Sequence, residues 1–293
     1  MAAQIIDGKA IAEKIKARLK EEMAQLPSGT LPCLATVLVG DDYGAAQYRG
    51  QIERLATGMG YRYVDARLPA DADLATIQAR VRELAEDPAV HGILPLRPFP
   101  PGVRDDAVIE CLPPGKDIDG FHPDNLGRLL LDVPQLIPST ARACMVALDG
   151  AGIDLTGKEV VVVGRSSTVG KPVGLLCMAR HATVTTLHSR TRDLPFHTRR
   201  ADVLIAAIGR ARFVTADHVG DGAVVIDVGI NWEESVAADG KKTGRLVGDV
   251  DTEAVARKAS YITPVPGGIG AITNACLLAN TLQALRLQTP GRG

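Results

Sequence analysis

The chain has 293 residues, of which 46% are hydrophobic, and its formal net charge is -1 at pH 7. Such a composition is typical of a globular protein with a sizeable core, and the length is that of about two domains. There is no long basic run, and only four Phe and one Trp are present. These features argue against a nucleic-acid partner or an anionic membrane surface.

The N-terminal segment lacks the charged-then-apolar order of a secretory signal, and no segment approaches about 18 uninterrupted apolar residues. A cytoplasmic location is therefore expected, with no membrane partner. The five cysteines are scattered and are never spaced as CxxC. They are interpreted as small apolar residues, and no metal site is expected.

The first half of the chain alternates between helix and strand patterns. Residues 10–26 carry apolar side chains at four-residue spacing, which predicts an amphipathic helix. The apolar run LPCLATVLVG at 31–40 predicts a strand buried on both faces of a parallel sheet. A helix containing Tyr48 follows, and a further helix near 72–86 leads to an apolar strand at 90–96.

The second half begins with a predicted helix near residue 139. Compact strands are then predicted at 159–164, 182–189, 202–209 and 223–230, and helical spacers separate the first three. This alternation predicts a second parallel sheet with helices on both faces. The segment after Gly270 returns to an amphipathic helix, which is expected to pack on the first domain.

A glycine loop runs from Gly164 to Pro172, between a predicted strand and a predicted helix. The free backbone N–H groups and the dipole of such a helix N-terminus suit a phosphate. The spacing matches neither a Walker A motif nor GxGxxG. On spacing alone, both a nucleotide-binding loop and an ordinary strand-to-helix turn remain open.

The next predicted strand ends in His188-Ser189-Arg190-Thr191, without the carboxylate that commonly holds the ribose 2′-hydroxyl of NAD. A cation and a hydroxyl at this place favour a 2′-phosphate, and therefore NADP. Arg165 in the glycine loop supplies a second cation, although a solvated surface arginine is the alternative interpretation.

Several motifs, in order, resemble the bifunctional methylenetetrahydrofolate dehydrogenase/methenyltetrahydrofolate cyclohydrolase family, and the resemblance runs nearly end to end. The motifs are KDIDGFH at 116–122, the loop at 164–172, HSRT at 188–191, DVGIN at 227–231, GDVD at 248–251 and TPVPGGIG at 263–270. An ordered set is far more specific than any single match.

The resemblance implies an α/β fold with a folate-binding catalytic domain (1–138 plus 271–293) and a Rossmann-type NADP domain (139–270). It also implies a homodimer that pairs through the NADP domain and a tetrahydrofolate one-carbon derivative as substrate. Tyr48 and Asp119 are implied as catalytic residues, and the implied substrate-binding residues are Tyr48, Asp119, Pro264, Gly267 and Gly268. Implied cofactor-binding residues are Gly164, Arg165, Ser166, Val169, Gly170, Pro172, His188, Ser189, Arg190, Ile208, Gly209, Ile230 and Thr273.

Two positions depart from the family pattern. The family's helix carries Tyr-x-x-x-Lys, and an ungapped alignment places Ile52 at the catalytic lysine. The glutamine that hydrogen-bonds this lysine in the family is replaced by Leu96. Arg49 and Arg54 flank the position, but arginine remains protonated and cannot accept a proton. Changes at Ser139 and Ala141, and at Ala271, also put the positioning of the substrate in question.

The two activities of the family make different demands. Hydride transfer to NADP needs mainly the orientation of two reactants, whereas hydrolysis of the methenyl product needs proton transfers. An aliphatic pair at positions 52 and 96 supplies no proton transfer. The sequence therefore predicts an NADP-dependent methylenetetrahydrofolate dehydrogenase with absent or weak cyclohydrolase activity. A paralogue acting on another pterin or one-carbon adduct, and a non-catalytic NADP-binding protein, are the alternatives.

Overall fold

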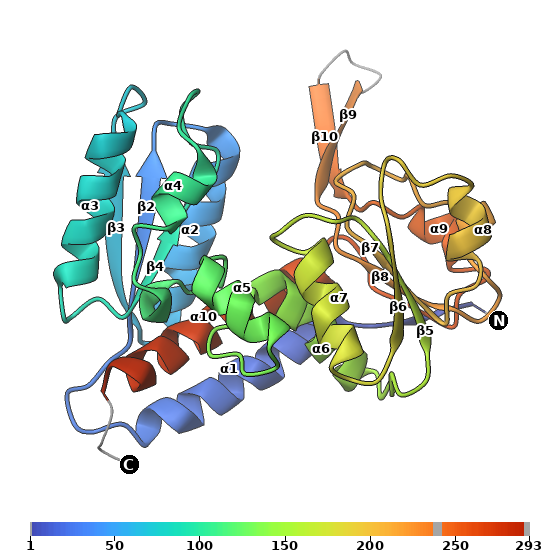
Figure 1. The fold of residues 1–293 in the computed structure, drawn as a ribbon, viewed down its shortest axis with the longest axis horizontal. Coiled ribbons are helices and arrows are strands. Elements are labelled where there is room, and N and C mark those ends of the chain that lie inside the picture. The colour runs from blue at the N-terminus through green and yellow to red at the C-terminus, as the bar shows by residue number, and fades with distance from the viewer. Residues whose placement is uncertain (1, 237–241, 290–293) are drawn as a thin grey trace. The chain divides into compact units, whose positions relative to one another are not determined.

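The computed structural model describes residues 2–236 and 242–289, and the chain divides into two compact units (Figure 1). One unit comprises Met1–Glu13 and Thr140–Thr273 and contains a six-stranded sheet. The other comprises Lys14–Ser139 and Asn274–Gly293 and contains a three-stranded sheet. The predicted fold class, two α/β domains with a parallel-sheet dinucleotide-binding type of unit, is confirmed.

Three helices contain the points at which the chain passes between the units. They are α1 (Gly8–Ala24), α6 (Ser139–Gly150) and α10 (Ile269–Gln288). All three were predicted from apolar spacing.

The sheet of the three-stranded unit is parallel, with β2 (Cys33–Val39) between β3 (Arg62–Leu68) and β4 (Gly92–Pro95). Every residue of β2 is buried, as expected for a central parallel strand with a continuous apolar sequence. Strand β3 was not predicted. It is an edge strand whose polar residues alternate irregularly with half-buried ones, so it lacks a clear apolar run.

Helices α2 (Tyr43–Gly58) and α3 (Leu74–Glu86) cover opposite faces of this sheet. Leu34 and Leu38 of β2 belong to a hydrophobic cluster with residues of α2 and α10, whereas Ala35 and Val37 belong to a second cluster with residues of α3. Successive side chains of a strand point to opposite faces, which explains the two clusters. Leu282 of α10 lies in the first cluster, so the C-terminal helix packs where the sequence predicted.

Short helices complete the three-stranded unit. They are α4 (Asp105–Ile109), the 3-10 helix η1 (Pro114–Lys116) and α5 (Pro123–Leu130).

The sheet of the six-stranded unit is parallel throughout and has the order β1-β11-β8-β7-β5-β6. The strands are β1 (Gln4–Ile5), β5 (Glu159–Val163), β6 (Thr183–Leu187), β7 (Val203–Ala206), β8 (Val224–Asp227) and β11 (Tyr261–Ile262). The four predicted strands are β5 to β8. Strand β1 pairs with β11 and so adds the N-terminal residues to this unit, whereas the sequence placed residues 1–138 in the folate-binding part.

Helices connect the strands of this unit as the alternation predicted. They are α7 (Gly170–Met178), α8 (Leu194–Thr198), the 3-10 helix η2 (Ala216–His218) and α9 (Thr252–Val255). Strand β5 lies between β6 and β7, so the chain changes direction across the sheet between β5 and β7. Ligands of open parallel sheets bind at the carboxyl ends of the strands beside such a switch point.

Strands β9 (Asn231–Val236) and β10 (Lys242–Val247) form an antiparallel pair that extends from the six-stranded unit (Figure 1). The pair was not predicted. Trp232 of β9 lies opposite Leu246 of β10, and both side chains are exposed.

Candidate functional site

Helix α2 presents the first group of candidate residues. Asp42 caps the helix, since its carboxylate accepts a hydrogen bond from the backbone N–H of Ala45 at 2.8 Å. Tyr48 and Ile52 are four residues apart and therefore share one face of the helix. Ile52 is only 1% exposed and belongs to the hydrophobic cluster that also contains residues of β2 and α10, and the half-buried Tyr48 packs against that cluster.

Leu96 follows directly after β4. Its backbone N–H donates to the carbonyl oxygen of Val37 at 2.9 Å, which extends the pairing with β2 by one residue. Its side chain is 3% exposed and lies in the same hydrophobic cluster as Ile52. The structure therefore brings Ile52 and Leu96 into one apolar cluster.

The two arginines that flank Ile52 do not enter that cluster. The Nη1 atom of Arg49 donates to Glu53 at 2.9 Å and to Asp65 at 3.0 Å, so its charge is already paired. Arg54 is exposed to solvent.

Asp119 lies in a loop that is shaped by a buried neighbour, Asp117. The carboxylate of Asp117 accepts hydrogen bonds from the backbone N–H groups of Gly120 at 3.1 Å and His122 at 2.6 Å, and from the amide of Asn125 at 3.1 Å. Gly120 has φ +76°, and a Cβ there would overlap the backbone of residues 137–138. The KDIDGF motif thus fixes the turn that carries Asp119.

Burial, together with the nearby charge of Asp117, raises the pKa of Asp119 to about 7, although Arg97 and the Ser139 hydroxyl oppose this shift. Burial and the charge of Asp119 also raise the pKa of Tyr48, so its phenol stays protonated. Tyr48 and Asp119 therefore interact electrostatically. Their chemistry suits a ligand that offers both a ring surface and N–H donors.

The glycine loop of the six-stranded unit connects β5 to α7. Gly164 has φ +133°, and a Cβ there would overlap the carbonyl oxygen of Ala207, which follows β7. A Cβ on Gly170 would overlap the carbonyl oxygen of Gly164. Glycine is required at both positions because the backbone folds tightly on itself. The hydroxyl oxygen of Ser166 accepts hydrogen bonds from the backbone N–H groups of Val169 at 3.1 Å and Gly170 at 3.3 Å.

This loop meets the chemical requirements of a dinucleotide phosphate. Pro172 is buried in the first turn of α7, where its lack of an N–H is harmless. Arg165 and Ser166 are exposed, and Arg165 forms no ion pair with the residues that the structure describes. A helix N-terminus with an unpaired arginine suits an anion.

The residues after β6 form a compact turn. The backbone N–H of His188 donates to the hydroxyl of Thr191 at 2.9 Å, and the Nδ1 atom of His188 accepts from the backbone N–H of Arg190 at 3.1 Å. Ser189 and Arg190 are exposed. Since β5 and β6 are adjacent and parallel, this turn and the glycine loop leave the same edge of the sheet.

Two buried aspartates organise the loops after β7 and β8, and the sequence analysis gave neither of them a role. The carboxylate of Asp249 accepts hydrogen bonds from the backbone N–H groups of Ile208 at 2.6 Å and Gly209 at 2.9 Å. Asp227 accepts from the backbone N–H of Asp249 at 2.9 Å. Burial is the main reason why the pKa of Asp227 is raised to about 6. The only signal in the sequence was the position of these aspartates within the family motifs.

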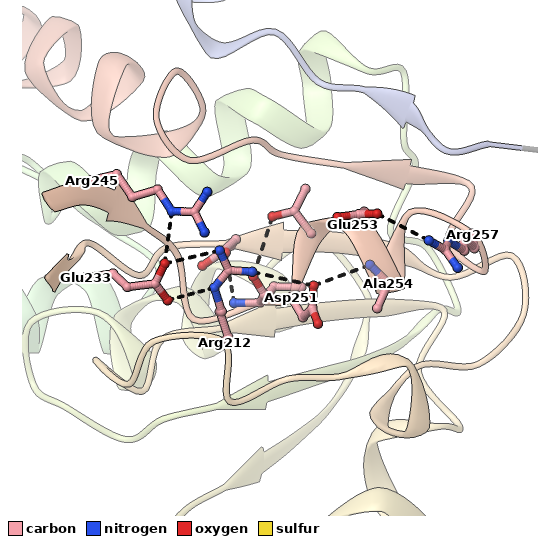
Figure 2. A network of polar contacts seen from close by, with 10 residues as sticks. Arg212, Glu233, Arg245, Asp251, Glu253, Ala254 and Arg257 are labelled. Carbon is pink, nitrogen blue, oxygen red and sulfur yellow. Dashed lines mark hydrogen bonds and ion pairs between the residues drawn. The ribbon is translucent and has the colours of Figure 1, made fainter. Parts of the chain in front are cut away.

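Ion pairs join the antiparallel strands to these loops (Figure 2). The guanidinium of Arg212 pairs with the carboxylate of Glu233 on β9 at 3.0 Å, and Arg245 on β10 pairs with the same carboxylate at 2.9 Å. Arg212 also lies 3.9 Å from Asp251, whose side chain caps α9. The network holds the base of the antiparallel pair against the segment that follows β7.

The PVPGG loop precedes α10 and packs closely on the N-terminal turn of α1. Gly267 has φ +104°, and a Cβ on Gly8 would overlap the carbonyl oxygen of Gly268. The aliphatic stem of Lys9 lies beside Gly267. Pro264 is half-buried, and its carbonyl oxygen would be overlapped by a Cβ on Gly268. This close backbone packing explains the paired glycines.

Two further predicted cofactor-binding residues lie in the six-stranded unit. Ile230 follows the loop after β8 and is 64% exposed. Thr273 is in the second turn of α10, where its hydroxyl donates to the carbonyl oxygen of Ile269 at 3.0 Å. No group of three or more metal-binding side chains occurs among residues 2–236 and 242–289, and no helix within those ranges is long and apolar enough to cross a membrane.

Comparisons with protein families match nearly the whole chain. Residues 6–119 match the model described as tetrahydrofolate dehydrogenase/cyclohydrolase, catalytic domain, and residues 138–289 match the corresponding NAD(P)-binding domain. The bifunctional protein FolD 2 of Geobacter sulfurreducens is 49% identical over 290 residues, which cover 99% of each chain.

Solved structures give the same result. The bifunctional FolD methylenetetrahydrofolate dehydrogenase/cyclohydrolase of Campylobacter jejuni superposes with a TM-score of 0.91 at 38% identity, covering 98% of this chain and 100% of that chain. The methylenetetrahydrofolate dehydrogenase-cyclohydrolase of Trypanosoma brucei, complexed with NADP cofactor and an inhibitor, has a TM-score of 0.93 at 35% identity and covers 99% and 100%.

Proposed function

The chain belongs to the tetrahydrofolate dehydrogenase/cyclohydrolase family, and from this premise we propose that it oxidises 5,10-methylenetetrahydrofolate to 5,10-methenyltetrahydrofolate with NADP. We further propose that its cyclohydrolase activity is absent or weak. The prediction of NADP as the cofactor is confirmed, since residues 138–289 match the family's NAD(P)-binding domain and the relative from Trypanosoma brucei holds NADP.

The dehydrogenase step requires chiefly that the protein position two reactants, the folate substrate and NADP. NADP supplies the hydride acceptor, and the nitrogen atoms beside the bridging carbon of the substrate stabilise the cation that remains. Orientation alone can account for about 7 to 11 kcal/mol of a barrier. Tyr48 and Asp119 retain a ring surface and a carboxyl group for the pterin.

The nucleotide side of the site rests on the edge of the six-stranded sheet. Gly164 and Gly170 allow the backbone of this turn to pack tightly on itself, and glycines in such strand-to-helix loops let the backbone approach a pyrophosphate. The exposed side chains of Arg165, Ser189 and Arg190 suit the 2′-phosphate that distinguishes NADP from NAD. We assign the remaining predicted cofactor residues to the same edge.

One observation carries the proposal of weak hydrolysis: Ile52 and Leu96 are both buried in one apolar cluster. Hydrolysis of the methenyl group requires a proton to leave the attacking water and a proton to reach a ring nitrogen, and such assistance contributes about 10² to 10⁴-fold in rate. Neither side chain exchanges protons. The sequence contains no lysine between Lys20 and Lys116, and Arg49 is paired with Glu53 and Asp65.

Asp119 is a remaining proton-transfer group, so the proposed loss of cyclohydrolase activity need not be complete. With a pKa of about 7, its carboxyl can exchange a proton near neutral pH. When the pterin is bound, however, the carboxylate is expected to accept hydrogen bonds from the N–H groups of the ring. We assign any residual hydrolysis to Asp119.

The test is a paired assay on one preparation of the full chain. With methylenetetrahydrofolate and NADP, we expect NADPH to form and the methenyl product to accumulate. Conversion of added methenyltetrahydrofolate should proceed near its uncatalysed rate, and Asp119→Asn should abolish any excess. Rapid enzymatic hydrolysis comparable to the oxidation rate would contradict the proposed loss.

Thermal-shift titration separates this proposal from its alternatives. Stabilisation by both NADP and a folate supports the dehydrogenase. Stabilisation by NADP and a different pterin would point to a paralogue with another substrate, and stabilisation by NADP alone would point to a binding protein.

We also propose that the protein is a homodimer that pairs through the six-stranded unit. The exposed cross-strand pair of Trp232 and Leu246 on the antiparallel arm supports this, since exposed large apolar side chains gather at interfaces. Sedimentation of the Trp232→Glu variant tests the proposal. A dimer is expected for the natural sequence and a monomer for the variant, and a variant that remains dimeric would place the interface elsewhere.

A further inference from the structure

The carboxylate of Asp249 occupies the centre of a buried group of hydrogen-bond donors. Its Oδ2 atom accepts from the backbone N–H groups of Ile208 at 2.6 Å and Gly209 at 2.9 Å. Its Oδ1 atom accepts from the backbone N–H of Arg210 at 2.9 Å and from the side-chain amide of Asn231 at 2.9 Å. Asp249 is fully buried, so none of these bonds is shared with bulk water.

A second carboxylate fixes Asp249 from behind. The backbone N–H of Asp249 donates to Oδ1 of Asp227 at 2.9 Å, and that oxygen also accepts from the backbone N–H of Gly229 at 2.9 Å. A Cβ on Gly229 would overlap the carboxylate of Asp249, and a Cβ on Gly248 would overlap the carboxylate of Asp227. Both glycines therefore leave room for the aspartate pair.

Three consecutive backbone N–H groups that converge on one anion form the arrangement with which loops commonly bind phosphates. In residues 208–210 an internal carboxylate fills this arrangement. These N–H groups are thus not available to the phosphates of a dinucleotide. They serve instead to hold the loop after β7 in one conformation.

That loop lies directly beside the glycine loop. A Cβ on Gly164 would overlap the carbonyl oxygen of Ala207, so the backbones that follow β5 and β7 are in close contact at the switch point of the sheet. A displacement of residues 208–210 would therefore change the conformation of the glycine loop at Gly164. Asn231, the residue after Ile230, donates its side-chain amide to the same carboxylate and so connects the loop after β8 to Asp249.

We propose that Asp249 is a positioning residue for the NADP site: its buried carboxylate fixes the loops after β7 and β8 beside the glycine loop through four hydrogen bonds. Asp249 acts through the backbone and need not touch the cofactor. The inference rests on the proposed function only in that NADP is the ligand measured.

The test is the Asp249→Asn variant of the full chain. An asparagine side chain has one acceptor oxygen, and its amide nitrogen would face N–H donors, so part of the set loses its partner. Loss of a hydrogen bond to a charged group corresponds to at least about a tenfold change in an equilibrium constant. We therefore expect the dissociation constant for NADP, measured by calorimetry without substrate, to rise about tenfold or more.

The matched control is Asp251→Asn. This aspartate is two residues away and caps α9, but makes no bond to residues 208–210. Asparagine caps helices as well as aspartate does. We expect its NADP dissociation constant to equal that of the unchanged protein.

Amide hydrogen exchange at residues 208–210 gives a readout that a general loss of stability would not produce. In Asp249→Asn these amides should exchange faster, while amides of β5 and β7 keep their protection. If Asp249→Asn does not fold, Asn231→Ala removes one donor and should raise the NADP dissociation constant about 2- to 10-fold.

Folded variants that bind NADP as tightly as the unchanged protein would overturn the inference. So would equal weakening in Asp249→Asn and Asp251→Asn. Because binding is measured rather than turnover, a failure of the proposed oxidation leaves this result interpretable. Absence of NADP binding by the unchanged protein would instead contradict the cofactor assignment itself.

Discussion

The burial of Ile52 and Leu96 in one apolar cluster leads to a quantitative prediction for a double-mutant cycle. Ile52→Lys alone places an ammonium group where the side chain is 1% exposed. An uncompensated buried charge costs about 3 to 5 kcal/mol of stability. Leu96→Gln alone buries an amide whose hydrogen bonds are unmade, at a cost of about 1 to 3 kcal/mol.

The double variant is expected to be more stable than the sum of these effects. Ile52 and Leu96 lie in one hydrophobic cluster, and under the proposed correspondence with the family's pair the new lysine and glutamine are expected to hydrogen-bond to each other. Residues that share such a contact show coupling free energies of about 0.5 to 3 kcal/mol. The free energy of unfolding, measured in urea for all four members of the cycle, gives this coupling directly.

The same cycle is then assayed for hydrolysis of methenyltetrahydrofolate. The double variant should gain a rate above the uncatalysed reaction, at most about 10² to 10⁴-fold, which is the usual contribution of proton transfer. Each single variant should gain less, because a lysine without its partner is poorly oriented and a glutamine transfers no proton.

Leu94→Gln combined with Ile52→Lys is the matched control, since Leu94 belongs to the same cluster and is 2% exposed. This pair should be destabilised without any gain in hydrolysis. Additive stabilities in the Ile52/Leu96 cycle, together with no gain in rate, would refute the proposed correspondence of these positions with the family's lysine and glutamine.

Other predictions concern the two halves of the site. Affinity for a folate analogue should rise as the pH is raised from about 6 to about 8, because Asp119, whose pKa is raised to about 7, becomes an acceptor for pterin N–H groups as it ionises. Calorimetry across this range checks the trend, and Asp119→Asn should remove it. Gly164→Ala should lower NADP affinity at least about tenfold, since its Cβ overlaps the carbonyl oxygen of Ala207 at a positive φ. Arg190→Ala should weaken binding of NADP about tenfold but leave binding of NAD unchanged, which competitive titration would show.

Much of the fold could be predicted because the strands that build it have continuous apolar sequences. Strands β2, β5, β7 and β8 are almost entirely buried and bounded by turns, so their apolar runs are unambiguous. Edge strand β6 is mostly exposed or half-buried, and only its last residue, Leu187, is buried. Strand β3 escaped prediction because it is a polar edge strand, and β1 and β11 because each has two residues. Their existence depends on a partner strand rather than on local sequence.

In the candidate site, too, some residues follow from local sequence patterns and others do not. The spacing of Tyr48 and Ile52 on one helical face is local, and both side chains lie on the side of α2 that packs in the hydrophobic cluster. Leu96 was singled out only because the resemblance to the family aligned the loop after β4. Its place in the same cluster as Ile52 has no signal in the local sequence. Asp249 was not singled out, because its four hydrogen-bond donors lie about 20 to 40 residues before it in the sequence. Such a convergence of distant segments leaves no local sequence pattern.

The pKa of Asp119 bears on which step of the proposed chemistry depends on proton transfer. Burial and the charge of Asp117 act on Asp119, and Arg97 and the Ser139 hydroxyl oppose them only in part, so its pKa rises to about 7. An ionisation in the neutral range makes hydrogen bonding of this carboxyl to a pterin dependent on pH, whereas the proposed replacement of the family's lysine by Ile52 would remove a proton-transfer group. Hydride transfer, which needs no proton at this place, is the step least affected by either change.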